Sequence, residues 1–534
     1  MAVRDQRLAA LALFVALTAA HTWPLASAPG TLSRNDNADA QLNAWILAWV
    51  PHAVVTDPLH LFDANIFHPD RHVLAYSEHL FVPAMMGAPL TWAGASPVLV
   101  HNLVLLAGLA LTGWATWWML WRWTGDWWAA AIGGCLAAFN AHTLTRMGHV
   151  QAMHVEFLPL ALLAFDRLVT APAPRRGIAL AWWFTLQSLC SLYLMVMAVF
   201  ALVAAALARA GEWARRDRAR GFLASTLLAA TLAAALCLPF LWPYAQVHRE
   251  TGLSRPLEEV ALYSADWRDY LTSAGRLHYA AWSHHFFRAA DALFPGITAM
   301  LLAGVAFCRG VAWRDPRARM LAAAGVLGVV LSFGARLPGY GWLHAAFPLL
   351  QGTRATSRFG YLGLFAIAGL AAYGLAVIRR DLASSRRRTL VAAVALVLVT
   401  VEAARAPMGY TPFGGIEAIY TRLAGLPGAV IAEFPFYSPH RIARNAPYVL
   451  ASTLHWRPLV NGYSGVVPPS YVAHNEQFRT FPSDEAVQAL RDAGVTHVVV
   501  HVEDDRPDIA AEIARRGDLD VFASAGGIVI YRLR

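Results

Sequence analysis

The chain has 534 residues, of which 57% are hydrophobic and only 14% are charged, and its formal net charge is +9. Water-soluble globular proteins are about 25% charged, so this composition argues against a soluble protein and favours one embedded in a membrane. Arginine supplies the whole basic excess, because the sequence contains no lysine. Membrane proteins collect basic residues in cytoplasmic loops, so the positive charge does not indicate a nucleic-acid partner.

Apolar runs near the length needed to cross a bilayer follow one another through the first three quarters of the chain. They predict a mainly α-helical, polytopic bundle of about eleven spans, at 8–27, 98–120, 127–141, 152–170, 177–191, 192–208, 221–241, 292–308, 318–335, 358–378 and 389–404. Segment 80–96 is also apolar but is interrupted by prolines, which favours a re-entrant or interfacial segment. Ala26-Ser27-Ala28 resembles a signal-peptidase site, and cleavage there would leave the later topology unchanged.

The arginines predict the orientation of these spans, because they fall in alternate loops that all lie inside if the N-terminus is cytoplasmic. The residues concerned are Arg4, Arg7, Arg122, Arg175, Arg176, Arg215, Arg216, Arg218, Arg220, Arg314, Arg317, Arg319, Arg379, Arg380 and Arg386–Arg388. An odd number of spans then places the C-terminal part outside. We therefore expect a transmembrane module over 1–405, with outer loops 28–79 and 243–291, and an extracytoplasmic α/β domain over 406–534.

The C-terminal part has the composition of a small soluble α/β domain. Runs rich in β-branched and aromatic residues predict strands at 430–436, 448–454, 495–501 and 528–533. Helices are predicted at 484–493, capped by Ser483, and at 508–515. No glycine-rich phosphate loop follows any of these strands, which argues against a soluble nucleotide as ligand. The four cysteines all lie in or at the edge of apolar spans, so no disulfide framework is predicted for the outer domain.

The first outer loop carries the most informative pattern. Four apolar residues of this loop follow helical spacing and predict a helix with one apolar face: Leu42, Trp45, Ile46 and Trp49. Its indole rings suit a helix lying in the membrane interface. Asp36 and Asp39 then fall at the N-terminal end of this helix, where backbone N–H groups favour an ionised carboxylate. From spacing alone, these acids either cap the helix or present a functional carboxylate beside the lipid headgroups.

Several runs resemble one family. They are DAQLNAW at 39–45 with Trp49, DPLHLFDANIF at 57–67, YSEHL at 76–80, RMGHVQ at 146–151 and RATSRF at 354–359. Together they resemble a largely uncharacterised bacterial group of the GT-C superfamily of integral-membrane glycosyltransferases, over nearly the whole chain. The loop aspartate of that group corresponds to Asp39, and Asp36 is an additional acid nearby. The acidic doublet common in better-known members is absent.

The resemblance implies an enzyme of the bacterial inner membrane that takes a sugar from a polyprenyl-phosphate donor at the outer face. The acceptor would be a glycan, a lipid or a protein, and the transfer would be inverting. Asp39 is the candidate general base, and Asp36 or a divalent metal such as Mg²⁺ or Mn²⁺ could share its role.

Cationic side chains are needed on the departing phosphate, where negative charge develops. The candidates are Arg146 and His149, between the third and fourth spans, and Arg354 and Arg358, before the tenth. Two simpler interpretations stay open: Arg358 reaches from a span end to lipid headgroups, and His149 is an ordinary surface histidine.

The same outer loop is rich in histidine. Five histidines lie there among acidic residues and could assemble a metal site, although no recognised ligand spacing appears. They are His52, His60, His68, His72 and His79. Two other functions stay open for the whole chain: a lipid-linked glycan transporter or flippase, and a non-enzymatic envelope-assembly protein. Charges buried in mid-span would favour transport. Most of the notable charges lie instead at the outer ends of spans, which favours surface chemistry.

Overall fold

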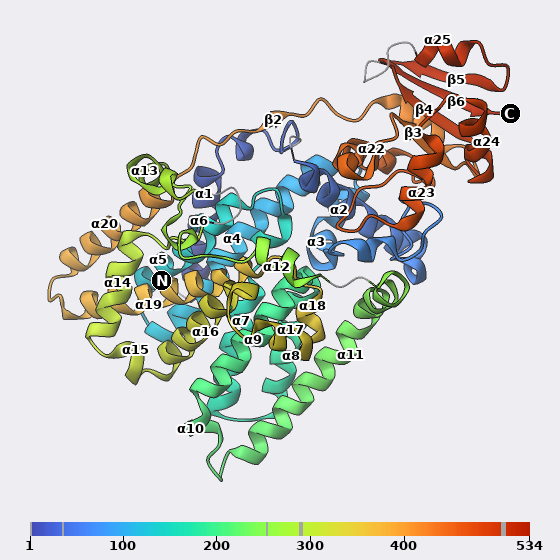
Figure 1. The fold of residues 1–534 in the computed structure, drawn as a ribbon. Helices are drawn as coiled ribbons and strands as arrows, with labels where there is room; N and C mark the ends of the chain where they lie inside the picture. Colours follow the sequence, from blue (N-terminus) through green and yellow to red (C-terminus); the bar gives the residue numbers. More distant parts are fainter. Residues whose placement is uncertain (1–2, 35–36, 253–254, 288–291, 503–508) are drawn as a thin grey trace. The chain divides into compact units, whose positions relative to one another are not determined.

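The computed structural model describes residues 3–34, 37–252, 255–287, 292–502 and 509–534, which are mainly α-helical with a four-stranded sheet near the C-terminus (Figure 1). The chain divides into two compact units. Unit 1 comprises Met1–Ala28, Val104–Leu241 and Leu253–Gly409, and unit 2 comprises Pro29–Leu103, Trp242–Gly252 and Tyr410–Arg534. Each unit is described separately.

Long helices rich in alanine, leucine and valine build unit 1. They are α1 (Val3–His21), α4 (Pro97–Thr124), α5 (Trp127–Ala138), α7 (Phe157–Thr170), α8 (Pro174–Cys190), α9 (Leu192–Ala208), α11 (Ala219–Thr251), α14 (Ile297–Cys308), α16 (Pro316–Ser332), α19 (Gly360–Asp381) and α20 (Ser385–Ala403). Helices α4 and α11 each continue across the boundary into unit 2.

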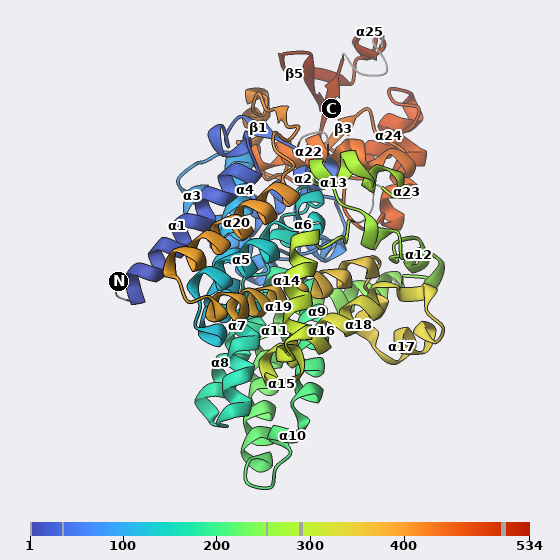
Figure 2. The ribbon, with the colours of Figure 1, turned by 90° about the vertical axis from the view of Figure 1, so that its left-hand side faces the viewer.

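Helix α19 lies at the centre of unit 1 and packs against α5, α14 and α16 (Figure 2). Small residues permit this close packing. A Cβ atom on Gly374 would lie 1.8 Å from the carbonyl oxygen of Leu302 in α14, and one on Gly325 of α16 would lie 2.4 Å from the Cβ of Ala366. Small residues at helix contacts are typical of helices that pack within membranes.

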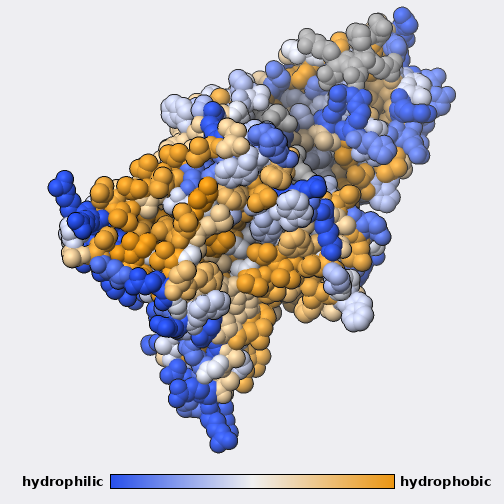
Figure 3. All heavy atoms as spheres, turned by 60° about the vertical axis from the view of Figure 1, so that its left-hand side comes forward, coloured by the Kyte–Doolittle hydropathy of each residue, from blue (hydrophilic) through white to orange (hydrophobic). Residues whose placement is uncertain are grey.

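Apolar side chains cover much of the outer surface of the unit 1 helices, and the turn between α10 (Ala210–Trp213) and α11 is hydrophilic (Figure 3). Leu227 of α11 is 68% exposed and Leu390 of α20 is 61% exposed. Among the described residues, three stretches are long and apolar enough to cross a membrane: Pro97–Thr124, Ala219–Thr251 and Thr356–Asp381. The predicted count of about eleven spans is not confirmed and stays a prediction.

The C-terminal sheet of unit 2 has strand order β3 (Ile431–Phe434), β4 (His497–His501), β6 (Ile528–Leu533), β5 (Leu519–Ala525). Strands β3 and β4 are parallel, and the other two pairs are antiparallel. One face of the sheet packs on α24 (Asp484–Asp492) and α25 (Ile509–Ala514) through a core that lies wholly within 432–533. Ser483 caps α24, as predicted, by accepting a hydrogen bond from the backbone N–H of Ala486 at 3.3 Å.

One prediction about this domain is wrong, and one strand was not predicted. Segment 448–454 is helical, as α22 (Ala446–Ala451) and η11 (Ser452–Leu454), rather than a strand. Its apolar residues are buried on all sides, and a buried helix and a buried strand have the same local pattern. Strand β5 was not predicted, although Gly526-Gly527 between 519–525 and 528–533 is the sequence signal of a hairpin, and both glycines have positive φ.

The first outer loop belongs to the same unit as the C-terminal domain. It contains α2 (Ala38–Thr56), α3 (Phe81–Trp92) follows it, and its strand β1 (Leu32–Ser33) pairs with β2 (Thr411–Pro412). Helix α2 packs against α3 and α22. Helix α3 lies within the segment predicted to be re-entrant or interfacial. The domain boundary predicted at residue 406 rests on membrane topology and stays a prediction.

Candidate functional site

Asp39 lies in the first turn of α2, but it does not cap this helix. The cap is Asn37, whose side-chain oxygen accepts hydrogen bonds from the N–H groups of Asp39 at 2.9 Å and Ala40 at 3.2 Å. The Asp39 carboxylate is half-buried and accepts a hydrogen bond from the Tyr463 hydroxyl at 2.7 Å. The simple capping interpretation therefore does not account for Asp39. Asp36 lies outside the described residues.

The apolar face of α2 packs inside unit 2. Trp45 is 1% exposed and Trp49 is 8% exposed, and the Trp49 indole N–H donates to the carbonyl oxygen of Leu61 at 2.9 Å. The Trp49 ring also lies 5.8 Å from that of Trp456. The loop itself and the C-terminal domain cover these indoles, and the prediction that the helix lies in the membrane interface stays a prediction.

Backbone hydrogen bonds fasten the first outer loop to the segment that carries Tyr463. The N–H of Phe67 donates to the carbonyl of Asn461 at 3.1 Å, and that of His68 donates to Leu459 at 3.0 Å. The Phe67 ring also occupies the space beside Gly462, where a Cβ atom would lie 2.6 Å from the ring. Glycine at position 462 therefore allows the first outer loop to pack close to the neighbouring Tyr463, which hydrogen-bonds to Asp39.

The histidines of the first outer loop do not converge on one point. His52 stacks on Trp456 with ring centroids 4.2 Å apart, and exposed His60 pairs with Asp57 at 2.9 Å. His79 is buried, and burial lowers its pKa to about 3, so the ring is neutral. In the part of the chain that the structure describes, no three His, Cys, Asp or Glu side chains form a group that could hold a metal ion.

Three of the four predicted phosphate-binding residues line one pocket in unit 1. Arg146 follows α6 (Ala141–Thr145), His149 precedes η4 (Val150–Met153), and Arg358 lies in η8 (Thr356–Phe359). Other polar side chains also line it, namely His142, Gln151, Ser191, Tyr193 and Tyr361, and the rest of the lining is apolar: Ala152, Val155, Leu194 and Met197. The pocket thus gathers two guanidinium groups and an imidazole from separate segments, which is a suitable arrangement for binding an anion.

Tyr193, which the sequence interpretation missed, organises this pocket. Its ring lies under the Arg358 guanidinium, 4.4 Å from the centroid, and its hydroxyl accepts hydrogen bonds from the N–H groups of Arg354 at 3.1 Å and Ala355 at 3.4 Å. A guanidinium over an aromatic face is attracted to the ring and held in orientation.

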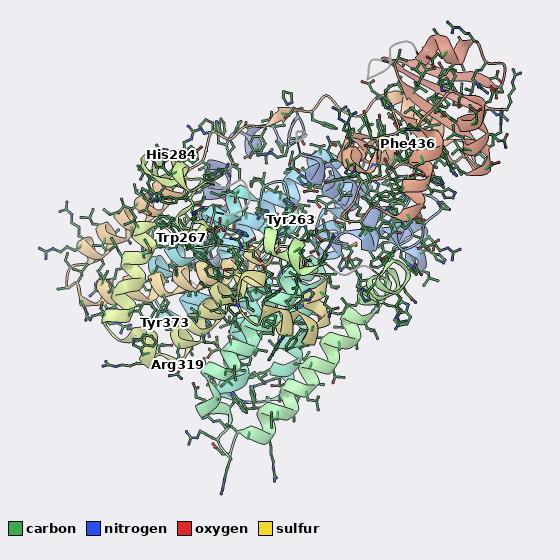
Figure 4. All side chains as sticks on the ribbon, in the orientation of Figure 1. Tyr263, Trp267, His284, Arg319, Tyr373 and Phe436 are labelled. Atoms are coloured by element: carbon green, nitrogen blue, oxygen red, sulfur yellow. The ribbon has the colours of Figure 1, made fainter. Side chains whose placement is uncertain are left out.

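Arg354 is not part of the pocket lining. Its guanidinium lies 4.7 Å from the centroid of the Tyr263 ring, which is labelled in Figure 4, and 3.7 Å from a carboxylate oxygen of Glu259. Glu259 also pairs with Arg255 at 3.4 Å. The structure therefore brings Arg146, His149 and Arg358 together and gives Arg354 a different, partly neutralised environment.

A buried pair supports the segment that carries Arg146 and His149. His154 Nδ1 lies 2.9 Å from Glu156, and its Nε2 lies 3.1 Å from the carbonyl oxygen of Val104. The Gln187 amide donates to the carbonyl oxygen of His154 at 2.9 Å and accepts from the N–H of Leu158 at 2.8 Å. The polar groups of this network satisfy one another inside the bundle and fix the backbone between the pocket and α7.

No protein-family model and no curated protein sequence matches the chain. Solved structures do match. The oligosaccharyltransferase AglB of Archaeoglobus fulgidus, in complex with an inhibitory peptide and a dolichol-phosphate, aligns with TM-score 0.54 and 13% identity over 99% of this chain and 74% of that one. An oligosaccharyltransferase of the same organism, tethered to an acceptor peptide with an NVT sequon, aligns with TM-score 0.52 and 12% identity over 95% and 70%.

The arabinosyltransferase EmbB of Mycobacterium smegmatis aligns with TM-score 0.38 and 14% identity over 97% of this chain and 45% of that one. The two oligosaccharyltransferase alignments each extend over nearly the whole of this chain, through both units. The chain therefore has the fold of these two oligosaccharyltransferases.

Proposed function

We propose that this protein is a GT-C-type glycosyltransferase that moves a sugar from a polyprenyl-phosphate donor to an acceptor at the outer face of the membrane. The observation that carries the proposal is the pocket lined by Arg146, His149 and Arg358. The fold supports it, because one AglB structure holds a dolichol-phosphate, a lipid-linked phosphate of the proposed chemical class. The acceptor is a hydroxyl or amide group of a glycan, a lipid or a protein.

In the proposed reaction, an acceptor oxygen or nitrogen attacks the anomeric carbon of the donor sugar. The bond from that carbon to the phosphate oxygen breaks, and the phosphate leaves with the bonding electron pair. The acceptor proton passes to the Asp39 carboxylate, whose position is fixed by the Tyr463 hydroxyl. Arg146 and Arg358 stabilise the charge that develops on the departing phosphate. A single displacement of this kind inverts the anomeric centre.

Replacing Asp39 tests the assignment of the base. Asn keeps the shape of Asp but cannot accept a proton at neutral pH, so Asp39→Asn should lose about 10²- to 10⁴-fold in turnover. Turnover is measured as transfer from a synthetic polyprenyl-phosphate sugar by the purified, monodisperse enzyme. Tyr463→Phe keeps the carboxylate and removes only the hydrogen bond that positions it, so its loss should be smaller.

Asp57→Asn is the matched control. Asp57 is an exposed acid of the same loop that pairs with His60, so removing its charge should leave turnover near the wild-type value. Wild-type turnover in Asp39→Asn, or equal losses in Asp39→Asn and Asp57→Asn, would refute the role of Asp39. Asp36→Asn, made in parallel, tests whether the neighbouring acid carries the role instead.

A further inference from the structure

A second basic cavity lies in unit 1, away from the pocket described above. It has a volume of about 410 Å³ and lies among α4, α7 and α8. Arg167 lies in the last turn of α7, and Arg175 lies in the first turn of α8. The pocket of Arg146 and His149 lies at the other end of α7, whose 14 residues span about 21 Å. The two sites are therefore distinct.

Asp166 acts on Arg167 from the neighbouring position, so the positive charge in this cavity is only partly compensated. Neither Arg167 nor Arg175 pairs with a carboxylate in the described part of the chain, and the neighbouring Asp166 is bonded to Arg209 and Arg317. Arg176 donates to the carbonyl oxygens of Arg167 and Ala171 and so ties the turn between α7 and α8. The guanidinium groups of Arg167 and Arg175 can therefore donate hydrogen bonds to a ligand, and the turn between α7 and α8 that carries them is held in place by Arg176.

Positive charge also surrounds the cavity. Arg122 and Arg176 repel the charge of Arg167, and Asp166 attracts it. The guanidinium of Arg7 lies 3.7 Å from the centroid of the Trp118 ring, which lines the cavity. A ligand that relieves this repulsion must be an anion. Phosphate oxygens are the groups that arginine binds bidentately.

The rest of the lining is apolar and aromatic. Leu160 and Leu163 of α7 project into the cavity, with Trp118 and Trp183 beside them. Indole rings favour the level of the glycerol and headgroups in a bilayer, and leucine side chains suit acyl chains. Arginine placement predicts that these helix ends face the cytoplasm, where the membrane surface carries anionic lipids. One cavity therefore combines a phosphate-binding end with a hydrocarbon-binding wall.

We propose that this cavity binds one anionic phospholipid. Its phosphate lies between Arg167 and Arg175, and its acyl chains lie along Leu160 and Leu163. This lipid is separate from the glycosyl donor and is not consumed. The proposal does not depend on the proposed transferase activity, because it rests on a different cavity and different residues.

The test measures lipid binding to the full-length protein by native mass spectrometry, with phosphatidylglycerol titrated against phosphatidylcholine. Wild type should bind one phosphatidylglycerol in preference to phosphatidylcholine. The double variant Arg167→Gln/Arg175→Gln should lose about 30-fold in affinity for phosphatidylglycerol, the usual value for two basic contacts. The control variant Arg215→Gln/Arg216→Gln removes the same charge from exposed positions of another predicted inner loop and should bind as wild type does.

Ala179→Trp provides a second variant that keeps every charge and fills the cavity, in case the double variant does not fold. It should also lose the bound lipid. The proposal is refuted by unchanged affinity in Ala179→Trp or in a folded double variant, or by an equal loss in the control. It is also refuted if inorganic phosphate displaces the lipid at millimolar concentration, which would indicate a site for free phosphate. Preference for polyprenyl phosphate over phosphatidylglycerol would assign the cavity to the donor lipid and would likewise overturn it.

Discussion

Arg354 and Arg358 are four residues apart in the chain, yet their guanidinium groups have different surroundings. Arg358 lines the pocket with Arg146 and His149, whereas Arg354 lies over Tyr263 and close to Glu259. Their sequence context is nearly the same, so the sequence predicted one role for both. Only the path of the backbone through η8 separates them.

The structure therefore predicts unequal effects of the two arginines on donor binding. Arg358→Ala should weaken binding of the polyprenyl-phosphate donor by about 10- to 150-fold, the value of a hydrogen bond to a charged group. Arg358→Lys should recover only part of the loss, since an ammonium group lacks the bidentate fork. Arg354→Ala should reduce donor affinity by less than about 3-fold. Glu259 already offsets the charge of Arg354, and an exposed ion pair of this kind contributes little. Equilibrium binding of the donor to purified variants measures both, and equal losses would contradict the division of roles.

Some residues of the candidate site could be predicted from the sequence, and others could not. Asp39, Arg146, His149 and Arg358 are recognisable because each lies in a run that resembles a family. Asn37 had a signal of its own, since asparagine is a preferred helix cap. Tyr463 had none, because it lies 424 residues from Asp39 and only the fold brings the two together. Tyr193 was missed for the same reason.

The helices and strands of the C-terminal domain show where the local sequence pattern is sufficient to predict an element and where it is not. Strands β3, β4 and β6 were predicted because their runs are rich in β-branched and aromatic residues. Helix α24 was predicted from the cap residue that precedes it, and α25 was predicted as well. The α22 segment was not, since burial on every side removes the periodicity. Aromatic residues of the C-terminal domain also contact the first outer loop. The ring of Tyr471 packs edge-on against Phe67 of the loop, and Phe436, labelled in Figure 4, stacks on Tyr471.

These contacts predict how the C-terminal domain behaves on its own. Its main core lies within 432–533, so residues 410–534 expressed alone should give a circular dichroism spectrum of mixed helix and strand. Joining residues 29–96 to them through a flexible linker should raise the melting temperature by roughly 4 to 8 °C, corresponding to about 2 kcal/mol. Reducing agent should leave both melting temperatures unchanged, since neither segment contains cysteine.

Gly462→Ala is the control for this comparison. A Cβ atom there meets the Phe67 ring at 2.6 Å, so the substitution should remove most of the gain in the linked protein and have little effect on residues 410–534 alone. An unfolded spectrum for 410–534 alone would show that its core depends on the loop. An equal melting temperature with and without 29–96 would show that the loop contributes nothing to its stability.

For the whole molecule, the arginine pattern predicts which side of the membrane each part faces. A reporter fused after Arg534 should be active only outside the cytoplasm, and one inserted near Arg216 only inside. The second site lies in the hydrophilic turn between α10 and α11, where an insertion disturbs little packing (Figure 3). Cytoplasmic activity of the C-terminal fusion would reverse the orientation and would place the proposed chemistry on the wrong face.

The hydrogen bonds between the first outer loop and the C-terminal domain join segments that are far apart in the sequence. Asn65 donates to the carbonyl oxygen of Arg457, 392 residues later. At 5–20 residues per second, a ribosome needs roughly 20 to 80 s to make the chain between them. Throughout that time Trp45 and Trp49 lack part of their covering. Asp39 therefore gains its tyrosine partner only after Tyr463 has been made. A product truncated before Tyr463 lacks the hydrogen bond that positions the proposed base.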